Sequence, residues 1–268
     1  MEKNENSQKK KPLSVKDILL RKKNKTPIIM LTAYDAQTAG ILEQAGVDIL
    51  LVGDSLGNVF QGQDSTRHVT MDHMLYHTET VRRGAPNSLI VADLPYKSYE
   101  TPEKALLNAQ KLMSVGANAV KLEGSPEGTV THIVSRGIPV MGHVGLLPQT
   151  AKDFTVKGKS EDEAGQIRTQ AKNLQSEGVF SIVLESVPES LAEELTNNLS
   201  IPTIGIGAGK YCNGQVLVIN DLIGLSTGKS PKFVKRYADI AKAIETAVCN
   251  FQSEVKTGTF PDSGHTYH

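Results

Sequence analysis

Short apolar runs recur along the chain, and each is followed by a polar or glycine-rich break and then by a longer stretch with helical spacing. The runs are rich in β-branched residues and show little alternation of apolar and polar positions. This pattern is typical of parallel strands covered on both faces. The predicted strands cover residues 27–32, 48–53, 88–92, 119–122, 139–142, 181–184, 202–205 and 215–219.

The stretches between these runs carry the start and stop signals of helices. Thr101 and Pro102 form a strong helix start, and Gly46 follows a helix end, where a left-handed cap is common. An extra helix before the first strand is expected to cover the floor of the sheet. The predicted helices cover residues 15–23, 36–45, 71–83, 101–115, 161–177 and 187–198, and a last one runs from after Pro231 to about Val255.

Strands that alternate with helices in this way indicate an α/β protein. Eight strands in this alternation favour a (β/α)8 TIM barrel with an extra N-terminal helix, and an open, doubly wound sheet is the competing fold. The length of 268 residues suits a single barrel, which commonly takes about 250. We therefore expect a flexible basic tail over residues 1–14 and one barrel domain over residues 15–268.

Composition excludes several classes of partner. Lys and Arg together number 29, as do Asp and Glu, so no net charge favours nucleic acid or an anionic membrane. No apolar run approaches the roughly 18 residues that a membrane helix needs, and the N-terminus lacks the apolar core of a signal peptide. Two cysteines without a CxxC pair suit a reducing compartment, so a cytoplasmic location is expected.

Acidic residues and one histidine stand at the ends of five successive predicted strands. One acid after a strand is more often a helix cap, but a barrel brings the carboxyl ends of all its strands to one mouth, where active sites form. Five in a row therefore indicate a functional site. The residues are Asp54 with Ser55, then Asp93, Glu123, His143 and Glu185.

The acids in this set suit a hard metal ion. Converging carboxylates repel one another unless a cation or a proton is present. Asp54, Asp93 and Glu123 supply oxygen ligands and no thiolate, which favours Mg²⁺, with Mn²⁺ possible, over Zn²⁺. A 2-oxo acid could chelate such an ion through two adjacent oxygens. His143 is expected to act as a hydrogen-bond donor rather than as a ligand.

Lys121 and Glu185 add candidate chemistry, each with a structural alternative. Lys121 lies two positions before Glu123 on the same strand face, so it either forms an ion pair with Glu123 or faces a substrate carboxylate or developing oxyanion. Glu185 follows an apolar run, and partial burial would make it a competent general base. The alternatives for Glu185 are a further metal ligand or a helix cap.

Other motifs carry weaker signals. Gly205–Lys210 is expected to line the mouth with tight backbone, with anion binding as the alternative. His73 and His77 have the spacing of a metal pair but no evident third ligand. Arg82–Arg83 is expected on a solvated or interface face. Tyr34 and Asp35, after the first predicted strand, could reach the site.

The chain resembles the ketopantoate hydroxymethyltransferase family. The resemblance runs from about Thr26 to the C-terminus, and its motifs occur in the expected order. They include VGDSLG, QGQDST, YHTETVRRGAPN, ADLPY, AVKLEG, GIPVMGHVGLLPQ, LESVP and IPTIGIGAG.

This resemblance implies a fold, a reaction and an assembly. The family folds as a (β/α)8 barrel, uses Mg²⁺, is cytoplasmic in bacteria and typically assembles as a homodecamer of two pentamer rings. It transfers a hydroxymethyl unit from 5,10-methylenetetrahydrofolate to 3-methyl-2-oxobutanoate, which gives 2-dehydropantoate in pantothenate biosynthesis. Small-molecule 2-oxo acid and folate are thus the expected partners, with no nucleic acid and no membrane.

The resemblance also implies roles for single residues. The metal-binding acids fall on Asp54, Asp93 and Glu123, the substrate contacts on Asp54, Ser55, Asp93 and Lys121, and the proton acceptor on Glu185. These positions agree with the strand-end reasoning. His143 is expected to orient an oxygen or to assist a proton transfer.

Two departures from the family pattern concern the loop after the fifth strand. Residues 150–158 lack a glycine pair usual in the family, and the loop is about two residues shorter. Leu147 stands where the family often has threonine. These differences bear on the folate side of the site and leave the acid set intact.

Two other functions stay open. The nearer is another Mg²⁺ enolate enzyme on a barrel, such as a lyase resembling the phosphoenolpyruvate mutase and isocitrate lyase group, which would need no folate. The farther is a non-catalytic ligand-binding or assembly protein that kept the fold.

Overall fold

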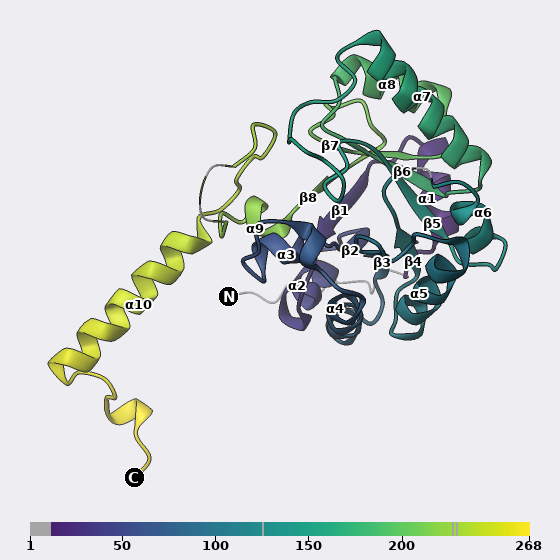
Figure 1. The fold of residues 1–268 in the computed structure, drawn as a ribbon. Coiled ribbons are helices and arrows are strands. Elements are labelled where there is room, and N and C mark those ends of the chain that lie inside the picture. Colours follow the sequence, from purple (N-terminus) through teal and green to yellow (C-terminus); the bar gives the residue numbers. More distant parts are fainter. Residues whose placement is uncertain (1–11, 125, 227, 229) are drawn as a thin grey trace. The chain divides into compact units, whose positions relative to one another are not determined.

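The computed structural model describes residues 12–124, 126–226, 228 and 230–268 (Figure 1). One compact unit ends at Val218, and a second spans Ile219–His268. The tail expected over residues 1–14 lies, up to residue 11, outside the described residues. Its flexibility and the single domain expected over residues 15–268 stay predictions.

The first unit is a closed barrel of parallel strands in which the spatial order follows the sequence (Figure 1). Strand β1 pairs with β2 on one side and with β8 on the other, which closes the sheet. This confirms the barrel and excludes the open, doubly wound sheet. Its described strands are β1 (Ile28–Thr32), β2 (Ile49–Val52), β3 (Leu89–Asp93), β4 (Ala119–Lys121), β5 (Val140–Gly145), β6 (Ser181–Glu185), β7 (Thr203–Ile206) and β8 (Gly214–Leu217).

All the predicted strands are present, with ends that differ by at most three residues. The largest difference is in β5, which continues to Gly145. His143 therefore lies inside this strand rather than at its end. Strand β8 ends at Leu217, and Ile219 already begins a helix.

Helices follow the strands and surround the barrel (Figure 1). Polar residues start several of them, and the side chains of Thr70, Thr101 and Ser160 accept hydrogen bonds from backbone N–H groups of the first turn. The helices of this unit are α1 (Val15–Lys23), α2 (Ala36–Gln44), α3 (Leu56–Val59), α4 (Met71–Gly84), α5 (Pro102–Ser114), α6 (Thr129–Val134), α7 (Glu161–Ser176) and α8 (Glu189–Asn198), with a 3₁₀ turn, η1, at Thr66–His68.

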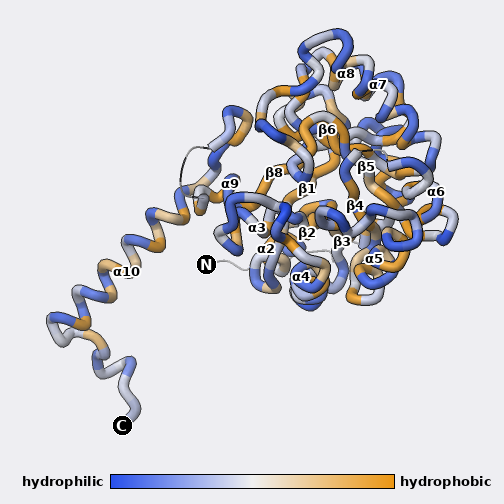
Figure 2. Tube along the Cα trace, in the orientation of Figure 1, coloured by the Kyte–Doolittle hydropathy of each residue, from blue (hydrophilic) through white to orange (hydrophobic). Residues whose placement is uncertain are grey.

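The barrel interior is apolar, and Figure 2 shows the strands mainly in hydrophobic colours. Inward-facing residues such as Met30, Val91 and Ile204 form one buried cluster, to which Ile18 of α1 also belongs. The Arg21 guanidinium holds α1 in place through an ion pair with Asp48, at 2.6 Å. The extra N-terminal helix thus covers the amino end of the strands, as predicted.

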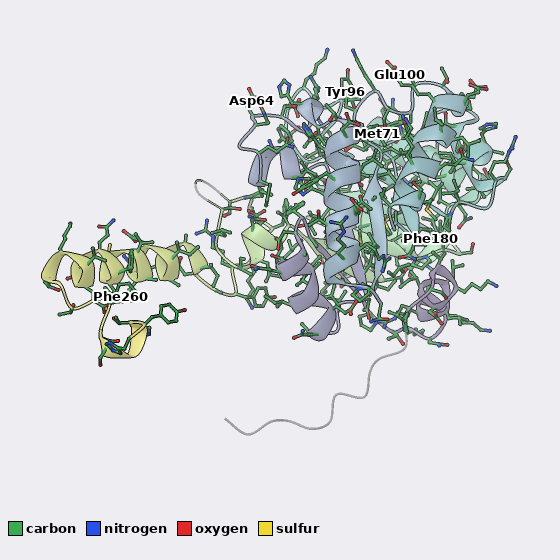
Figure 3. All side chains as sticks on the ribbon, turned by 90° about the horizontal axis from the view of Figure 1, so that it is seen from below. Asp64, Met71, Tyr96, Glu100, Phe180 and Phe260 are labelled. Atoms are coloured by element: carbon green, nitrogen blue, oxygen red, sulfur yellow. The ribbon has the colours of Figure 1, made fainter. Side chains whose placement is uncertain are left out.

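The opposite end of the barrel carries the loops that follow the strands. Figure 3 shows Asp64, Tyr96 and Glu100, which follow β2 and β3, toward one end, and Phe180, which precedes β6, toward the other. The chemistry expected from the sequence belongs to the former end.

The second unit contains α9 (Ile219–Leu222), α10 (Ile240–Thr257) and η2 (Ser263–His265). Helix α10 begins later than predicted, because the side chain of Asp239 caps it by accepting from the Lys242 N–H. One face of α10 exposes apolar side chains at helical spacing, and Figure 2 shows the helix alternating in colour. These residues are Ile240, Ile244, Val248, Phe251 and Val255. None of the helices in the described chain is long and apolar enough to cross a membrane.

Candidate active site

The candidate site residues meet at the carboxyl ends of β2 to β6. Polar contacts connect Asp54, Asp93 and Lys121, and His143 lies close to Glu185. All are buried except Ser55 and Glu185, which are partly exposed. Asp54 and Ser55 follow β2, Asp93 ends β3, Lys121 ends β4, Glu123 lies just beyond it, His143 lies in β5 and Glu185 ends β6.

Asp93, at the end of β3, contacts residues at the ends of the neighbouring strands on both sides. Its Oδ1 lies 2.7 Å from the Nζ of Lys121, and its Oδ2 accepts a hydrogen bond of 3.1 Å from the backbone N–H of Asp54. Lys121 therefore pairs with Asp93 rather than with Glu123, the partner in the ion-pair alternative. Neighbouring strands lie about 4.8 Å apart, whereas alternate residues on one strand are about 6.6 Å apart, so the cross-strand partner is nearer.

His143 lies between two glutamates. Its Nε2 is 3.2 Å from Oε2 of Glu185, and its Nδ1 is 3.8 Å from Oε1 of Glu123. Neither ring nitrogen makes a well-aligned hydrogen bond among the described residues, so the contact with Glu185 is close but bent. Burial lowers the pKa of His143, against the opposing effect of Glu185. A neutral ring has one N–H, and Glu185 is its nearer acceptor.

Negative charge exceeds positive charge in this cluster. Burial, and then the charge of Asp93, raise the pKa of Asp54 to about 7. Burial and the charge of Asp54 hold the pKa of Glu123 well above its usual value. Burial alone would lower the pKa of Lys121, but Asp93 and the other carboxylates outweigh it and raise that pKa. The cluster therefore favours uptake of protons or of a cation.

Sequence reasoning missed Gln149, which is 1% exposed and contacts two of the acids. Its Nε2 donates to Oδ2 of Asp54 at 2.7 Å, and its backbone N–H donates to Oε2 of Glu123 at 3.0 Å. Tyr99 donates its hydroxyl to Oε1 of Gln149. An uncharged amide in a loop carries no chemical signal of its own, and only its position after β5 could have pointed to it.

Tyr34 reaches the site, as the sequence suggested. It is buried, and its hydroxyl lies 2.8 Å from Oγ of Ser55. Burial raises the pKa of Tyr34, so the phenol is neutral. The Ser55 side chain makes no capping bond to α3, so its hydroxyl is free for this contact.

Two of the weaker motifs have structural roles. His73 caps α4 by accepting from the Thr70 N–H, and buried His77 contacts the Tyr34 carbonyl, so they form no metal pair. Arg83 is exposed, as expected of a solvated face, whereas Arg82 is partly buried and its guanidinium donates to backbone carbonyls that include that of Gly116. A guanidinium has five donors, which suits it to tying loops together.

Two backbone groups of the glycine-rich segment after β7 already have protein partners. The Lys210 N–H donates to the side chain of Glu189, so this donor does not face an anion, and the Gly209 carbonyl accepts from Gln215. These contacts favour the expected role, in which tightly packed backbone of this segment lines the mouth of the barrel.

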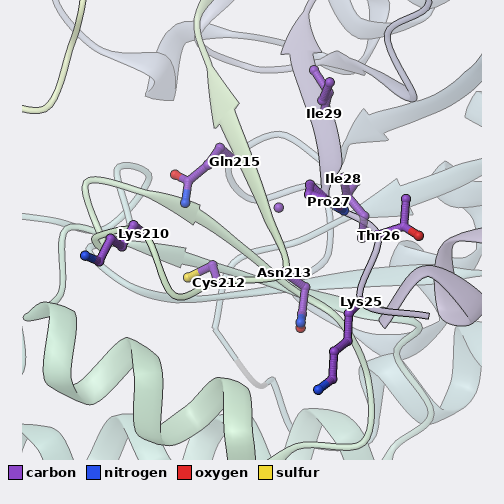
Figure 4. Close-up of a pocket in the computed structure, with 10 residues that line it drawn as sticks. Lys25, Thr26, Pro27, Ile28, Ile29, Lys210, Cys212, Asn213 and Gln215 are labelled. Atoms are coloured by element: carbon purple, nitrogen blue, oxygen red, sulfur yellow. The ribbon is translucent and has the colours of Figure 1, made fainter. Parts of the chain in front are cut away.

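A pocket of about 360 Å³ lies elsewhere, at the starts of β1 and β8 (Figure 4). Its lining includes Lys25, Lys210 and Cys212, and no carboxylate contributes to it. It holds none of the predicted site residues, so the candidate chemistry belongs to the buried cluster.

Asp54, Asp93 and Glu123 are the residues that could hold a metal ion. Within the described ranges, no group of three or more His, Cys, Asp and Glu side chains is arranged so that it could hold a metal ion by itself. Mg²⁺ usually binds one or two carboxylates and completes its shell with water and substrate oxygens. Carboxylate oxygens with excess negative charge fit such an ion.

Comparison with known proteins adds to this geometry. The sequence matches the family described as ketopantoate hydroxymethyltransferase over residues 12–263. It is 51% identical over 255 residues to a protein of Thermosipho africanus named 3-methyl-2-oxobutanoate hydroxymethyltransferase, with 93% of this chain and 96% of that protein covered.

Two solved structures share the fold. One is phosphonopyruvate hydrolase in complex with oxalate and Mg²⁺, with a TM-score of 0.62, 11% identity, and 94% of this chain and 93% of that chain covered. The other is 2,3-dimethylmalate lyase, described as a PEP mutase/isocitrate lyase superfamily member, with a TM-score of 0.60, 14% identity, and 94% and 91% covered. At these identities the likeness concerns the barrel alone. The match over residues 12–263 and the relative at 51% identity show that the chain belongs to the ketopantoate hydroxymethyltransferase family.

Proposed function

We propose that the chain transfers a hydroxymethyl unit from 5,10-methylenetetrahydrofolate to 3-methyl-2-oxobutanoate, giving 2-dehydropantoate for pantothenate biosynthesis. The observation that carries the proposal is the buried acid cluster around Lys121 at the mouth of the barrel. Membership of the family and the name of the Thermosipho africanus relative support the choice of substrate.

Asp54, Asp93 and Glu123 would hold Mg²⁺. The raised pKa values of Asp54 and Glu123 support this assignment, because buried carboxylates that repel one another favour a cation beside them. When bound, the ion supplies a Lewis acid that binds the carboxylate and keto oxygens of the 2-oxo acid. The phosphonopyruvate hydrolase structure contains Mg²⁺ with oxalate, a comparable chelating anion, on a similar barrel.

The polar groups beside the acids would bind and orient the substrate. Lys121 is buried and cationic, and it would face the substrate carboxylate and the oxygen that gains charge when the proton leaves. Asp54, Asp93 and Ser55 complete the proposed contacts. The Tyr34 hydroxyl would hold the Ser55 side chain in place through the contact between the two hydroxyl groups.

Glu185 would act as the general base. Its side chain is 17% exposed, more than that of its neighbour His143, so a substrate in the mouth can reach it. Glu185 would remove the proton from the carbon next to the ketone. Water would cleave the two C–N bonds of the folate's methylene bridge, which releases tetrahydrofolate and a one-carbon unit at the formaldehyde level. The deprotonated carbon would add to that unit, and protonation of the new alkoxide would give the hydroxymethyl group. His143 would orient the Glu185 carboxylate and assist the proton transfer.

A reconstitution assay tests this function. The protein is incubated with 3-methyl-2-oxobutanoate, 5,10-methylenetetrahydrofolate and Mg²⁺, and 2-dehydropantoate is measured by mass spectrometry. The account predicts product that requires both the folate and the metal. Turnover of the oxo acid without folate would instead support the lyase function, and binding of the oxo acid without any turnover would support a non-catalytic role.

The proposal includes a cytoplasmic homodecamer with no nucleic-acid or membrane partner. The exposed apolar face of α10 supports self-association, because such faces mark interaction surfaces. The free thiols of Cys212 and Cys249 are compatible with a reducing compartment.

A further inference from the structure

Gln149 is buried in the centre of the acid cluster and contacts acids from two different strands. Its side-chain amide reaches Asp54, which follows β2, and its backbone N–H reaches Glu123, which follows β4. One residue thereby contacts two carboxylates that are 69 positions apart in the sequence.

The Gln149 amide has only one orientation that satisfies its neighbours. Its NH₂ group donates to Asp54 and to the Leu94 carbonyl, at 2.7 and 3.0 Å. Its Oε1 accepts from the Tyr99 hydroxyl. A flipped amide would place its oxygen against the Asp54 carboxylate and its NH₂ group against the Tyr99 hydroxyl, so the contacts assign the orientation.

The backbone of Gln149 is held from outside the cluster. Arg67, in the η1 turn, donates from Nε to the Gln149 carbonyl at 2.7 Å and from Nη2 to the Ala151 carbonyl at 2.9 Å. This contact anchors the loop that follows β5. It therefore also fixes the N–H group that Glu123 accepts from.

We propose that Gln149 is a positioning residue that holds Asp54 and Glu123 in the arrangement that binds a divalent cation, with Arg67 anchoring it through the loop after β5. This inference rests on the proposed function, because it takes both acids as metal ligands. Hydrogen bonds from neighbouring residues orient carboxylate ligands in metal sites, and their loss commonly costs ten- to a hundredfold in metal affinity.

Calorimetry with Mn²⁺ alone tests this inference on Gln149→Met, which keeps the side-chain length and removes the amide. The matched control is Gln166→Met, at an exposed glutamine of α7. We expect the Kd for Mn²⁺ to rise about tenfold or more in Gln149→Met and to stay unchanged in the control. A purely structural role would lower the melting temperature of the metal-free protein and leave the Kd unchanged.

Arg67→Met provides a second variant if Gln149→Met fails to fold, because Arg67 is exposed and its loss opens no cavity. We expect a rise in Kd of about threefold, with Arg83→Met as the exposed control. An unchanged Kd in folded Gln149→Met, or in Arg67→Met if the former does not fold, would overturn the inference. So would wild-type protein that binds no Mn²⁺.

A different result would exclude the proposed function. Wild-type protein that binds Mn²⁺ but makes no 2-dehydropantoate would show that the chain does not catalyse the proposed reaction. The comparison of Kd between wild type and Gln149→Met would still decide the role of Gln149.

Discussion

Lys121 and Asp93 are paired residues on adjacent parallel strands, and the Nζ of Lys121 lies 2.7 Å from Oδ1 of Asp93. Both side chains are almost fully buried. The barrel register thus places one cation directly beside an acid cluster in which Asp54 and Glu123 have raised pKa values. The same ion pair therefore stabilises the folded barrel and holds two residues that we propose bind the substrate.

Lys121→Met should destabilise the metal-free protein by about 3 kcal/mol at neutral pH, because removing one partner leaves a buried carboxylate unpaired. Since the pKa of Lys121 is raised, its stabilising effect is present through the neutral range and is lost only as the pH rises above the ordinary value of 10.5. Denaturant unfolding in EDTA measures the change, with exposed Lys242→Met as control. Equal stabilities of Lys121→Met and wild type would contradict the account.

Asp93→Asn should weaken Mg²⁺ binding by about ten- to a hundredfold. The amide retains the shape of the side chain but removes its charge. Calorimetry with Mg²⁺ measures the affinity. Asp64→Asn is the control, since the Asp64 side chain is 92% exposed. Normal Mg²⁺ affinity in Asp93→Asn would remove Asp93 from the proposed ligand set.

Metal affinity should rise with pH and level off above about pH 7. Burial and Asp93 raise the pKa of Asp54 from 3.8 to about 7, and a protonated carboxyl must lose its proton before it can bind an ion. Binding at pH 6 should therefore release protons, which titrations in buffers of different ionisation enthalpy detect. A pH-independent affinity without proton release would speak against these ligands.

The raised pKa of Asp54 has the opposite effect on the stability of the metal-free protein, which should fall as the pH rises. Because the folded-state pKa of Asp54 exceeds the unfolded value, the folded state binds more protons, and its stability falls as the pH rises from about 4 to 7. Saturating Mg²⁺ should largely remove this loss. Unfolding curves across that pH range, with and without Mg²⁺, measure both effects.

Much of the fold could be predicted from the sequence, because most strands are short apolar runs and most of the long helices begin at a polar N-cap. The start of α10 was missed, since the cap at Asp239 competes with the earlier signal at Pro231. Short elements such as α3 and α6, of four and six residues, carry too few positions for a periodic pattern.

The candidate acids could be predicted because they stand at strand ends, where a barrel gathers them. The partner of Lys121 could not, because it depends on the register between β3 and β4, and sequence spacing within one strand pointed to Glu123. Gln149 was missed because a neutral amide shows its role only through the contacts that the fold creates.

Replacing Val248 and Phe251 together by serine should reduce the size of the proposed assembly, because both lie on the exposed apolar face of α10. Light scattering coupled to size exclusion measures the mass. Gln252→Ser, a polar position on the same helix, is the control. A wild-type monomer, or a double variant of unchanged mass, would contradict self-association through this face.

The central claim is metal-assisted proton removal by Glu185, and proton NMR of 3-methyl-2-oxobutanoate in D₂O tests it most directly. With Mg²⁺ and without folate, wild-type protein should abolish the methine signal, whereas Glu185→Gln should retain Mg²⁺ binding and leave that signal in place. EDTA should prevent the loss in wild type. Equal exchange by Glu185→Gln and wild type, or no exchange by a wild type that binds Mg²⁺, would contradict the account.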